Sequence, residues 1–367
     1  MKFIDLQRQY QIYKSELDAA IHQVLDHGAY IMGPEVFAVE KELAAFTGVK
    51  HCLLASSGTD TLLMALMALD IQPGDEVITV PFTFVAPVEV IALLKAIPVF
   101  VDIDPYTFNM DIDQLAAAIT PRTKAIIPVS LFGQMPNYDQ LNAVAAKHNI
   151  PVIEDGAQSF GATQRGRRSC SVSTIGSTSF YPAKPLGCYG DGGALFTNDD
   201  VLAAKMRAIR THGGEKKYHH LYIGINGRCD TIQAAVLGVK LKYFDEELKA
   251  RNAIAQRYDK ALRDTCITPK VEEGNTHSYA QYTIRIADRD GLSEVLQKNN
   301  IPTCIFYPEG LHLTPAFSYL GLPKGSFPVT EQMTQEVISL PMHPWLSPEE
   351  QDLICEEVLK FASTANV

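Results

Sequence analysis

The sequence has no block of basic residues and no long uninterrupted hydrophobic run. Its 32 lysines and arginines are outnumbered by 42 acidic residues, which gives a formal net charge of −10 at neutral pH. We therefore expect no nucleic-acid partner, because binding nucleic acid needs clustered positive charge. The most apolar stretch, residues 77–101, is interrupted by prolines and charged residues. It therefore predicts a strand, a helix and a strand, and we expect no membrane span.

Cysteine pairs and the common nucleotide-binding signatures are missing as well. The seven cysteines are scattered, odd in number and never spaced as Cys-x-x-Cys. This pattern is typical of reduced thiols in a cytoplasmic protein, and it predicts neither a disulfide framework nor a metal site. The chain also has no G-x-G-x-x-G pattern and no G-x-x-x-x-G-K-[ST] pattern. Their absence counts against a dinucleotide or a triphosphate as ligand.

The chain does show an alternation of short apolar strands with helices over residues 51–155. This rhythm predicts an α/β protein with a mostly parallel sheet covered by helices on both faces. A long helical pattern at about residues 230–262 then leads into a smaller α+β region. We predict a large domain at residues 1–239 and a small C-terminal domain at residues 240–367. In such sheets, ligands bind beyond the carboxyl ends of the strands.

Lys184 lies in an unusual setting, with Pro182 before it and Pro185 directly after it. Prolines fix the local backbone and remove amide donors, so this side chain leaves the chain in a defined direction. Such a lysine can form a Schiff base if its surroundings lower its pKa. The alternative is an ordinary turn lysine whose amine reaches water.

Two further motifs lie where predicted strands end. Ser57-Gly58-Thr59 joins a strand to a helix, where free amides and the helix dipole favour a phosphate group. An ordinary helix cap is the alternative. Glu154 and Asp155 end another apolar strand and point to opposite faces, so one of them can address a given ligand. A single buried carboxylate suits a protonated ring nitrogen, with a strand-end cap as the alternative.

Together with the aromatic pair Phe82 and Phe84, these motifs describe a pocket for pyridoxal 5′-phosphate (PLP). The phosphate seat anchors the cofactor and an aromatic ring stacks on its pyridine. The aspartate keeps the ring nitrogen protonated, and the lysine forms the covalent link.

The sequence resembles the DegT/StrS family of PLP-dependent sugar-nucleotide aminotransferases. Five motifs carry the resemblance in order, at residues 57–60, 154–161, 179–187, 190–193 and 224–230. The resemblance implies the fold-type-I architecture, a large domain with a mostly parallel seven-stranded sheet between helices plus a small C-terminal α+β domain. It also implies PLP, or its pyridoxamine form, as cofactor.

The resemblance further implies roles for individual residues. Lys184 corresponds to the Schiff-base lysine and proton shuttle, and Asp155 to the partner of the pyridine nitrogen. The other residues expected at the cofactor are Gly58, Thr59, Phe84, Gln158, Ser179 and Asn226. Gln158 is expected near the phenolic oxygen, and Phe84 is favoured over Phe82 as the stacking ring. Asn226 is expected to reach the phosphate from a neighbouring subunit, which implies a homodimer.

Within the family, the chain looks most similar to enzymes that aminate UDP-2-acetamido-2-deoxy-3-oxo-glucuronic acid. Those enzymes use L-glutamate as donor and serve bacterial surface polysaccharide (O-antigen) synthesis. The residues expected to face the substrate are Gly28, Tyr30, Ala183, Arg228, Phe306, Tyr307 and His312. Arg228 is suited to a carboxylate, or alternatively to fixing the Asn226 turn through Asp230. Lys216 and Lys217 are candidates for the diphosphate, with a solvated loop as the alternative.

Two positions depart from the family pattern. Close relatives often carry a hydroxyl residue where this chain has Ala183, and a histidine where it has Phe306. We expect His312 to compensate for the second change. Three alternatives stay open at this point: an aminotransferase acting at C4 of another keto-sugar nucleotide, a PLP-dependent sugar dehydratase, and a ligand-binding regulator of the same fold.

Overall fold

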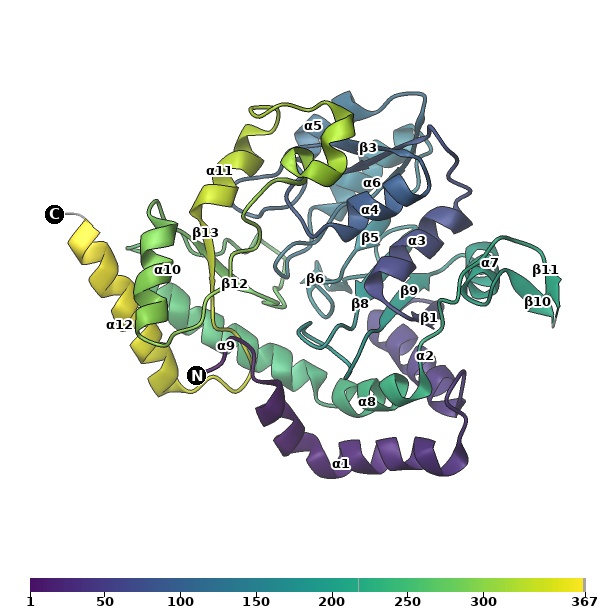
Figure 1. Cartoon of the computed structure of the whole chain (residues 1–367), viewed down its shortest axis with the longest axis horizontal. Coiled ribbons are helices and arrows are strands. Elements are labelled where there is room, and N and C mark those ends of the chain that lie inside the picture. Colours follow the sequence, from purple (N-terminus) through teal and green to yellow (C-terminus); the bar gives the residue numbers. More distant parts are fainter. Residues whose placement is uncertain (217, 366–367) are drawn as a thin grey trace.

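The computed structural model describes residues 1–216 and 218–365 (Figure 1). The chain begins with two helices, α1 (Leu6–His27) and α2 (Pro34–Thr47). A glycine caps the C-terminus of each helix. Gly28 has φ 70° and Gly48 has φ 80°, a left-handed conformation that glycine adopts without steric cost.

Seven strands form the main sheet, in the order β1-β9-β8-β5-β4-β2-β3. Two hydrogen-bonded ladders make up its two parts, and parallel bridges between Ile126 and Val152 and between Val129 and Asp155 join β4 to β5. Within the described residues, β9 runs antiparallel to its neighbours β1 and β8, and the other neighbouring strands are parallel. The seven-stranded, mostly parallel sheet is therefore confirmed. Its strands are β1 (His51–Ala55), β2 (Glu76–Thr79), β3 (Ile97–Phe100), β4 (Thr123–Ile126), β5 (Ile153–Asp155), β8 (Ile175–Ser179) and β9 (Gly193–Thr197).

Helices cover both faces of this sheet. Along β1, Cys52 and Leu54 join a core formed with α1 and α2, whereas Leu53 and Ala55 join a core on the opposite face. This alternation follows from the two-residue period of a strand, and burial of both faces is typical of parallel sheets. The helices that follow α2 in the large domain are α3 (Gly58–Ala68), α4 (Ala86–Leu93), α5 (Ile112–Ala118), α6 (Tyr138–Lys147), α7 (Asp200–Arg210) and α8 (Thr231–Leu241).

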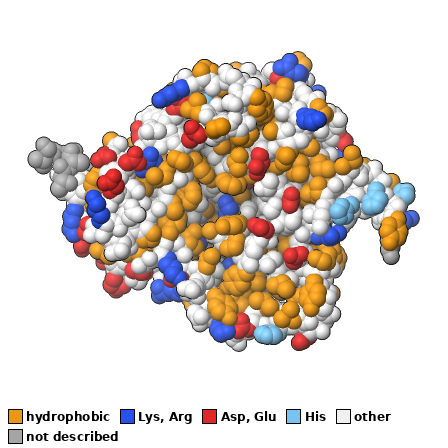
Figure 2. All heavy atoms as spheres, in the orientation of Figure 1, with side chains coloured by type: hydrophobic (Ala, Val, Ile, Leu, Met, Phe, Trp, Pro, Cys, Tyr) orange, Lys and Arg blue, Asp and Glu red, His pale blue; other side chains and the backbone are white. Residues whose placement is uncertain are grey.

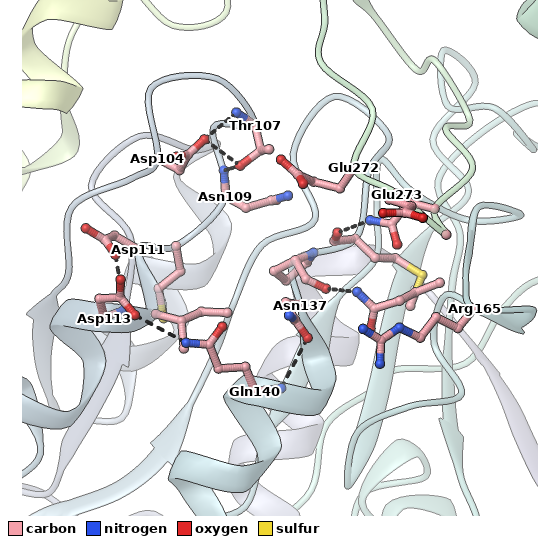
Figure 3. Close-up of a pocket in the computed structure, with 17 residues that line it drawn as sticks. Asp104, Thr107, Asn109, Asp111, Asp113, Asn137, Gln140, Arg165, Glu272 and Glu273 are labelled. Atoms are coloured by element: carbon pink, nitrogen blue, oxygen red, sulfur yellow. Dashed lines mark hydrogen bonds between the residues drawn. The ribbon is translucent and has the colours of Figure 1, made fainter.

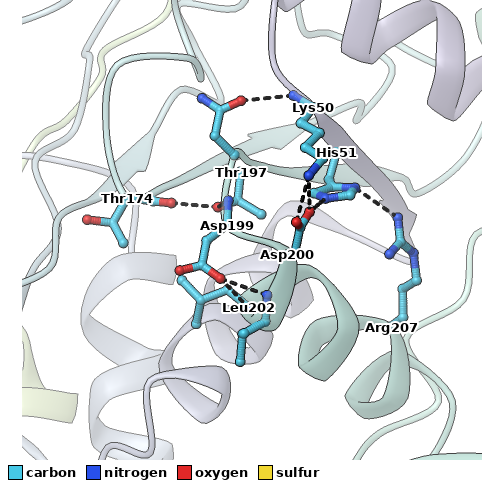
Figure 4. A network of polar contacts seen from close by, with 10 residues as sticks. Lys50, His51, Thr174, Thr197, Asp199, Asp200, Leu202 and Arg207 are labelled. Atoms are coloured by element: carbon cyan, nitrogen blue, oxygen red, sulfur yellow. Dashed lines mark hydrogen bonds and ion pairs between the residues drawn. The ribbon is translucent and has the colours of Figure 1, made fainter.

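Helix α7 is fixed to the edge of the sheet by a polar network at its first turn (Figure 4). Asp199 caps the helix by accepting backbone N–H groups of the first turn. Asp200, the next residue, pairs with Lys50 and His51 at the start of β1, with N···O distances of 2.6 Å. Negative charge at a helix N-terminus is favourable because of the helix dipole. The network therefore joins α7 to β1.

The long helix predicted near residues 230–262 is in fact two helices, α8 and α9 (Phe244–Leu262). They meet at Tyr243, whose ring stacks on Tyr13 of α1 with centroids 4.4 Å apart. The contact with α1 explains the break, since tertiary packing overrides the helical propensity of the sequence.

The C-terminal region forms a second, smaller sheet with its own core. Its strands β12 (Tyr282–Arg285) and β13 (Val337–Leu340) pair antiparallel. They share a core cluster with α9 and with two further helices, α10 (Arg289–Lys298) and α12 (Pro348–Ala365). This separate core supports a domain boundary near residue 240, which we retain as a proposal.

Residues 303–307 form no strand, and Cys304 makes a single bridge to Ser339. The chain then returns to the large domain through η1 (Leu311–Leu313), η2 (Pro315–Leu320) and α11 (Pro328–Glu336). There Leu311 packs with Phe100 of β3.

Two small hairpins complete the fold, β6 (Thr163–Gln164) with β7 (Arg167–Arg168), and β10 (Gly214–Lys216) with β11 (His219–His220). The second hairpin projects from the body of the molecule beyond α7 (Figure 1). None of the described helices is both long enough and apolar enough to cross a membrane.

Candidate active site

Lys184 lies in a tight turn that follows β8. Its backbone N–H donates to the carbonyl of Tyr181 at 2.9 Å. The side chain is partly buried, and this burial lowers the pKa of the amine, whereas the negative charge of Asp155 opposes the shift. A lowered pKa leaves more of the amine neutral and nucleophilic near pH 7.

Asp155 occupies the carboxyl end of β5, with 6% of its surface exposed. Backbone hydrogen bonds to Pro128 and Ser130, each of 3.0 Å, fix its position. Burial raises the pKa of its carboxyl group, although the backbone N–H of Ala157 and the charge of Lys184 act in the opposite direction. A cation held against this carboxylate would lower its pKa. The position therefore fits a protonated ring nitrogen.

Gln158 is held at both ends of its amide. Its Oε1 accepts the N–H of Phe132 at 2.8 Å, and its Nε2 donates to the hydroxyl of Tyr307 at 3.2 Å. Burial raises the pKa of that hydroxyl, and the charge of Asp155 adds to the effect. The structure thus brings Asp155, Gln158 and Tyr307 together, although Tyr307 is about 150 residues away in sequence.

The predicted phosphate seat is formed by contact between α3 and β8. Gly58 begins α3, and the hydroxyl of Ser57 caps this helix by accepting the N–H of Asp60 at 3.0 Å. A Cβ atom at Gly58 would lie 2.6 Å from the Cβ of Ser179. Glycine has no side chain, so Ser179 can approach the first turn of α3 closely. Its hydroxyl therefore lies beside the free amides of that turn. Thr59, in the same first turn, is partly buried. Such a helix N-terminus suits a phosphate group.

The two candidate stacking rings have different surroundings. Phe82 has no exposed surface and packs against Phe108, Phe132 and Tyr307. Phe84 is 53% exposed. A fully buried ring has no free face for a ligand, so the packing favours Phe84.

This difference predicts opposite effects for two alanine substitutions. We expect Phe82→Ala to lower the free energy of unfolding by about 3–5 kcal/mol, because it opens a cavity among aromatic rings. Phe84→Ala should change this free energy by no more than about 0.5 kcal/mol, and should weaken PLP binding about fivefold to tenfold. Urea unfolding of the cofactor-free protein and a PLP titration measure the two effects. Unchanged PLP affinity in Phe84→Ala would contradict the assignment.

Asn226 and Arg228 line a pocket of about 540 Å³ together with Ser57, the cap of α3. Tyr30 lies beside it, since its carbonyl accepts the N–H of Thr231 and the next residue bridges to Asp230. Gly28, the cap of α1, hydrogen-bonds to Tyr30. The pocket is lined by Ile31, Ser56, Ser57, Asp60, Gly190, Asp191, Asn226, Arg228, Asp230 and Gln233.

Arg228 has an unsatisfied group in this pocket. Its Nε is buried without a hydrogen-bond partner, and no ion pair to Asp230 or to another residue is found in the described part of the chain. A buried polar group without a partner costs free energy. The ion pair to Asp230 that a role in fixing the turn predicts is thus missing from the described residues, and the ligand role of Arg228 stays a prediction.

The other residues predicted at the substrate have mixed outcomes. His312 is 2% exposed, with its Nε2 3.0 Å from Glu331 and its ring against Phe327. The ring thus lies between η1 and α11, and its contact with the substrate stays a prediction. Phe306 packs between Phe3 and Tyr307. Ala183 is partly buried in the Lys184 turn. Lys216 is exposed on β10, and Lys217 lies outside the described residues.

Two residues that the sequence analysis missed hold the backbone on the two sides of Lys184. The thiol of Cys188 donates to the carbonyls of Phe180 and Gly190 at 3.0 and 3.1 Å. The Oε1 of Gln233 accepts the N–H of Tyr189 at 2.8 Å. Gln233 is a polar residue within the largely apolar helix α8. This contrast is the sequence feature that could have identified it.

A cavity of about 680 Å³ lies away from these residues (Figure 3). Acidic and amide side chains line it, and none of the predicted site residues is among them. Several of its polar groups already have partners. Asp104 accepts hydrogen bonds from Thr107, and Asp113 accepts one from Gln140. The predicted active site therefore stays at Lys184.

Comparison with known proteins agrees with this geometry. The profile of the DegT/DnrJ/EryC1/StrS aminotransferase family matches residues 11–359. The chain belongs to this family. It is therefore a PLP-dependent aminotransferase with the fold-type-I architecture, as the sequence motifs indicated.

Three proteins illustrate the similarity. The UDP-2-acetamido-2-deoxy-3-oxo-D-glucuronate aminotransferase of Pseudomonas aeruginosa is 51% identical over 356 residues, which cover 97% of this chain and 98% of that relative. The crystal structure of a DegT/DnrJ/EryC1/StrS aminotransferase from Brucella abortus is 46% identical, with a TM-score of 0.96 and 99% of both chains covered. NtdA from Bacillus subtilis, solved with bound cofactor PMP, is 29% identical with a TM-score of 0.91, covering 99% of this chain and 85% of that one.

Proposed function

We propose that this aminotransferase transfers the amino group of L-glutamate to C3 of UDP-2-acetamido-2-deoxy-3-oxo-glucuronic acid. The product would be the 3-amino sugar for bacterial surface polysaccharide (O-antigen) synthesis, made in the cytoplasm. The observation that carries the proposal is the 51% identity, over nearly the whole chain, to the relative of that name.

Arg228 supports a sugar acid as the acceptor. Its guanidinium Nε is buried and has no partner in the described part of the chain. A carboxylate meets a guanidinium with two parallel hydrogen bonds. A sugar without a carboxylate would leave this group unsatisfied, and that would cost affinity.

The residues around Lys184 have distinct roles in this proposal. PLP supplies an electron sink and a carbonyl carbon that takes up the amino group. The first turn of α3, with Gly58 and Thr59, and the Ser179 hydroxyl bind its phosphate. Asp155 keeps a proton on the ring nitrogen. The amine of Lys184 takes the proton from the Cα of glutamate, and its lowered pKa increases the fraction of free base.

Gln158 and Phe84 orient the cofactor ring. The amide of Gln158 cannot rotate freely, because Phe132 and Tyr307 hold both of its ends. It is therefore preorganised to donate its second N–H to the phenolic oxygen. Phe84, whose ring is exposed, would cover one face of the pyridine.

We further propose that the active unit is a homodimer, with Asn226 of one chain reaching the phosphate in the other. Asn226 is exposed, as are large hydrophobic side chains near it. Tyr30, Ile31 and Ile223 are 49%, 50% and 88% exposed. The space-filling view shows hydrophobic side chains on the projecting hairpin and over the α1 region (Figure 2). Extensive exposed apolar surface is typical of an interaction site.

One experiment tests the acceptor. The pyridoxamine form of the enzyme is mixed with 3-oxo and 4-oxo UDP-sugars, each with and without the C6 carboxylate, and the absorbance of the lysine-bound cofactor is followed. We expect the 3-oxo sugar acid to restore this absorbance fastest. Arg228→Leu should lower the reaction rate with that sugar by about 10-fold to 150-fold. The rate with the sugar that lacks a carboxylate should change much less. Faster reaction with a 4-oxo sugar would overturn the proposal in favour of C4 amination.

The dehydratase alternative has a separate readout. Glutamate turnover by an aminotransferase releases 2-oxoglutarate, whereas loss of a hydroxyl from a sugar does not. The retained lysine at position 184 disfavours the dehydratases that carry histidine there. A ligand-binding regulator is disfavoured by the complete set formed by Lys184, Asp155 and the Gly58 seat.

A further inference from the structure

Helix α8 supports the far end of the turn that carries Lys184. The buried Nζ of Lys240 donates a hydrogen bond to the carbonyl of Gly187. Gln233 of the same helix accepts the N–H of Tyr189 at 2.8 Å. Because positions seven apart lie on one face of a helix, the two side chains hold residues 187–189 from the same side.

Lys240 is an unusual residue for a buried helix face. It is 2% exposed, whereas lysine is almost never fully buried unless it is paired. No ion pair to Lys240 is found among residues 1–216 and 218–365. Its ammonium group instead faces the carbonyl of Gly187 and lies 5.3 Å from the centroid of the Tyr189 ring. The charge is thus directed at the segment after Lys184.

Two charged residues of α9, Glu247 and Arg251, lie near the ammonium group of Lys240. Burial lowers the pKa of Lys240 to about 8, and the nearby charge of Glu247 opposes this shift, while Arg251 adds to it. Glu247 is itself hydrogen-bonded by Gln9 of α1 at 3.2 Å. Removal of the ammonium group would leave the carbonyl of Gly187 buried without this donor, which is unfavourable.

The turn itself is compact, so a displacement of Gly187 reaches Lys184. A Cβ atom at Gly187 would lie 2.6 Å from the carbonyl oxygen of Pro182 and 2.7 Å from that of Tyr181. The same Tyr181 carbonyl accepts the backbone N–H of Lys184. Gly187 and Lys184 are therefore packed on one carbonyl group.

We propose that Lys240 is a positioning residue, which aims the amine of Lys184 by holding the carbonyl of Gly187. The proposal rests on the assigned role of Lys184 as the residue joined to PLP. Lys240 touches neither cofactor nor substrate. It sets the geometry of the turn, and with it the rate at which Lys184 reacts.

The test compares Lys240→Met with Lys242→Met. Lys242 is a lysine two residues later, 60% exposed and paired with Glu16, so its substitution controls for the loss of one positive charge. PLP alone is mixed with each cofactor-free protein, and the rise of the lysine-bound absorbance is followed. We expect Lys240→Met to slow this capture about tenfold, because a small misplacement of a reacting group is costly. Lys242→Met should match the wild type.

Two further measurements separate positioning from a general loss of structure. PLP affinity without the covalent bond, measured in a Lys184→Ala background, should be equal within about twofold with and without Lys240→Met. Gln233→Leu, which keeps Lys240 and removes the second contact of α8, should slow capture in the same direction and by less. It also gives a result if Lys240→Met does not fold.

The outcomes are distinguishable. If the wild type itself forms no lysine-bound absorbance, the role of Lys184 is wrong. If the wild type forms it and both Lys240→Met and Gln233→Leu capture PLP at the wild-type rate, the positioning role of Lys240 is wrong. Slow capture that merely follows a weaker non-covalent affinity would also overturn the proposal.

Discussion

Lys184→Ala is expected to slow amino transfer at least about a thousandfold while the protein remains folded. The substitution removes both the nucleophile that joins the cofactor and the base that moves the Cα proton, and proton transfer by a positioned side chain alone contributes about 10²–10⁴-fold. Within the described part of the chain the amine of Lys184 makes no hydrogen bond or ion pair. Its loss should therefore cost little stability. The rate of 2-oxoglutarate release from glutamate measures the effect.

Borohydride reduction followed by mass spectrometry provides a second measurement. The wild type should gain the mass of the reduced cofactor on the peptide that contains residue 184, and Lys184→Ala should not. Lys205→Ala is a suitable control, since this lysine lies in α7 and pairs with Asp70. Retention of more than about one tenth of the wild-type rate by Lys184→Ala would contradict its role.

Mixing Lys184→Ala chains with Asn226→Ala chains extends this prediction to the proposed dimer. If Asn226 completes the site of the other chain, each mixed dimer holds one intact site of two. Random pairing makes half of the dimers mixed, so up to about a quarter of the wild-type activity should return. No recovery after exchange of subunits would place Asn226 at the site of its own chain.

The residues of the proposed PLP pocket stand out in the sequence because each belongs to a short motif at the end of a strand. Lys184, Asp155 and Gly58 are far apart in sequence, yet a parallel sheet brings the carboxyl ends of its strands to one edge. The local motif gave the residue type, and the strand–helix alternation gave the common location. The fold class was predictable for the same reason, since burial of both faces leaves short apolar strands.

Local sequence patterns do not reveal features whose positions depend on distant contacts. His312 is buried beside Glu331, and its contact with the substrate stays a prediction. The helix breaks at Tyr243 because Tyr13 of α1 packs on it. The resemblance already favoured Phe84 over Phe82, and the structure adds a physical reason, because Phe82 packs against Phe108, Phe132 and Tyr307.

Asp155→Asn should lower kcat by about 10²–10⁴-fold. Asparagine fills nearly the same space but carries no charge, so it cannot keep a proton on the ring nitrogen, and the electron sink is lost. KM for glutamate should change much less, because Asp155 faces the cofactor rather than the amino-acid donor. Single-turnover kinetics with glutamate measure the step directly.

Glu154→Gln is the matched control. Glu154 precedes Asp155 in β5, has no exposed surface, and accepts a hydrogen bond from Ser169 at 2.7 Å on the other face of the strand. Burial raises its pKa to about 7. Glutamine keeps the accepting oxygen, so kcat should stay within about threefold of the wild type. A similar loss of kcat in both variants would indicate a structural effect of strand β5 rather than cofactor chemistry.

Asp155→Asn should also stabilise the cofactor-free protein at neutral pH. Burial raises the pKa of Asp155 in the folded chain, so between its unfolded pKa and the raised value the folded state binds more protons than the unfolded state. The contribution of this group to stability therefore falls as the pH rises from about 4 through the raised pKa. Asp155→Asn removes this pH-dependent loss of stability. Urea unfolding at pH 4 and pH 8 should show a smaller loss of stability in the variant than in the wild type. An aspartate that lowers stability and raises activity is kept for its chemistry, and equal pH dependence in both proteins would contradict this account.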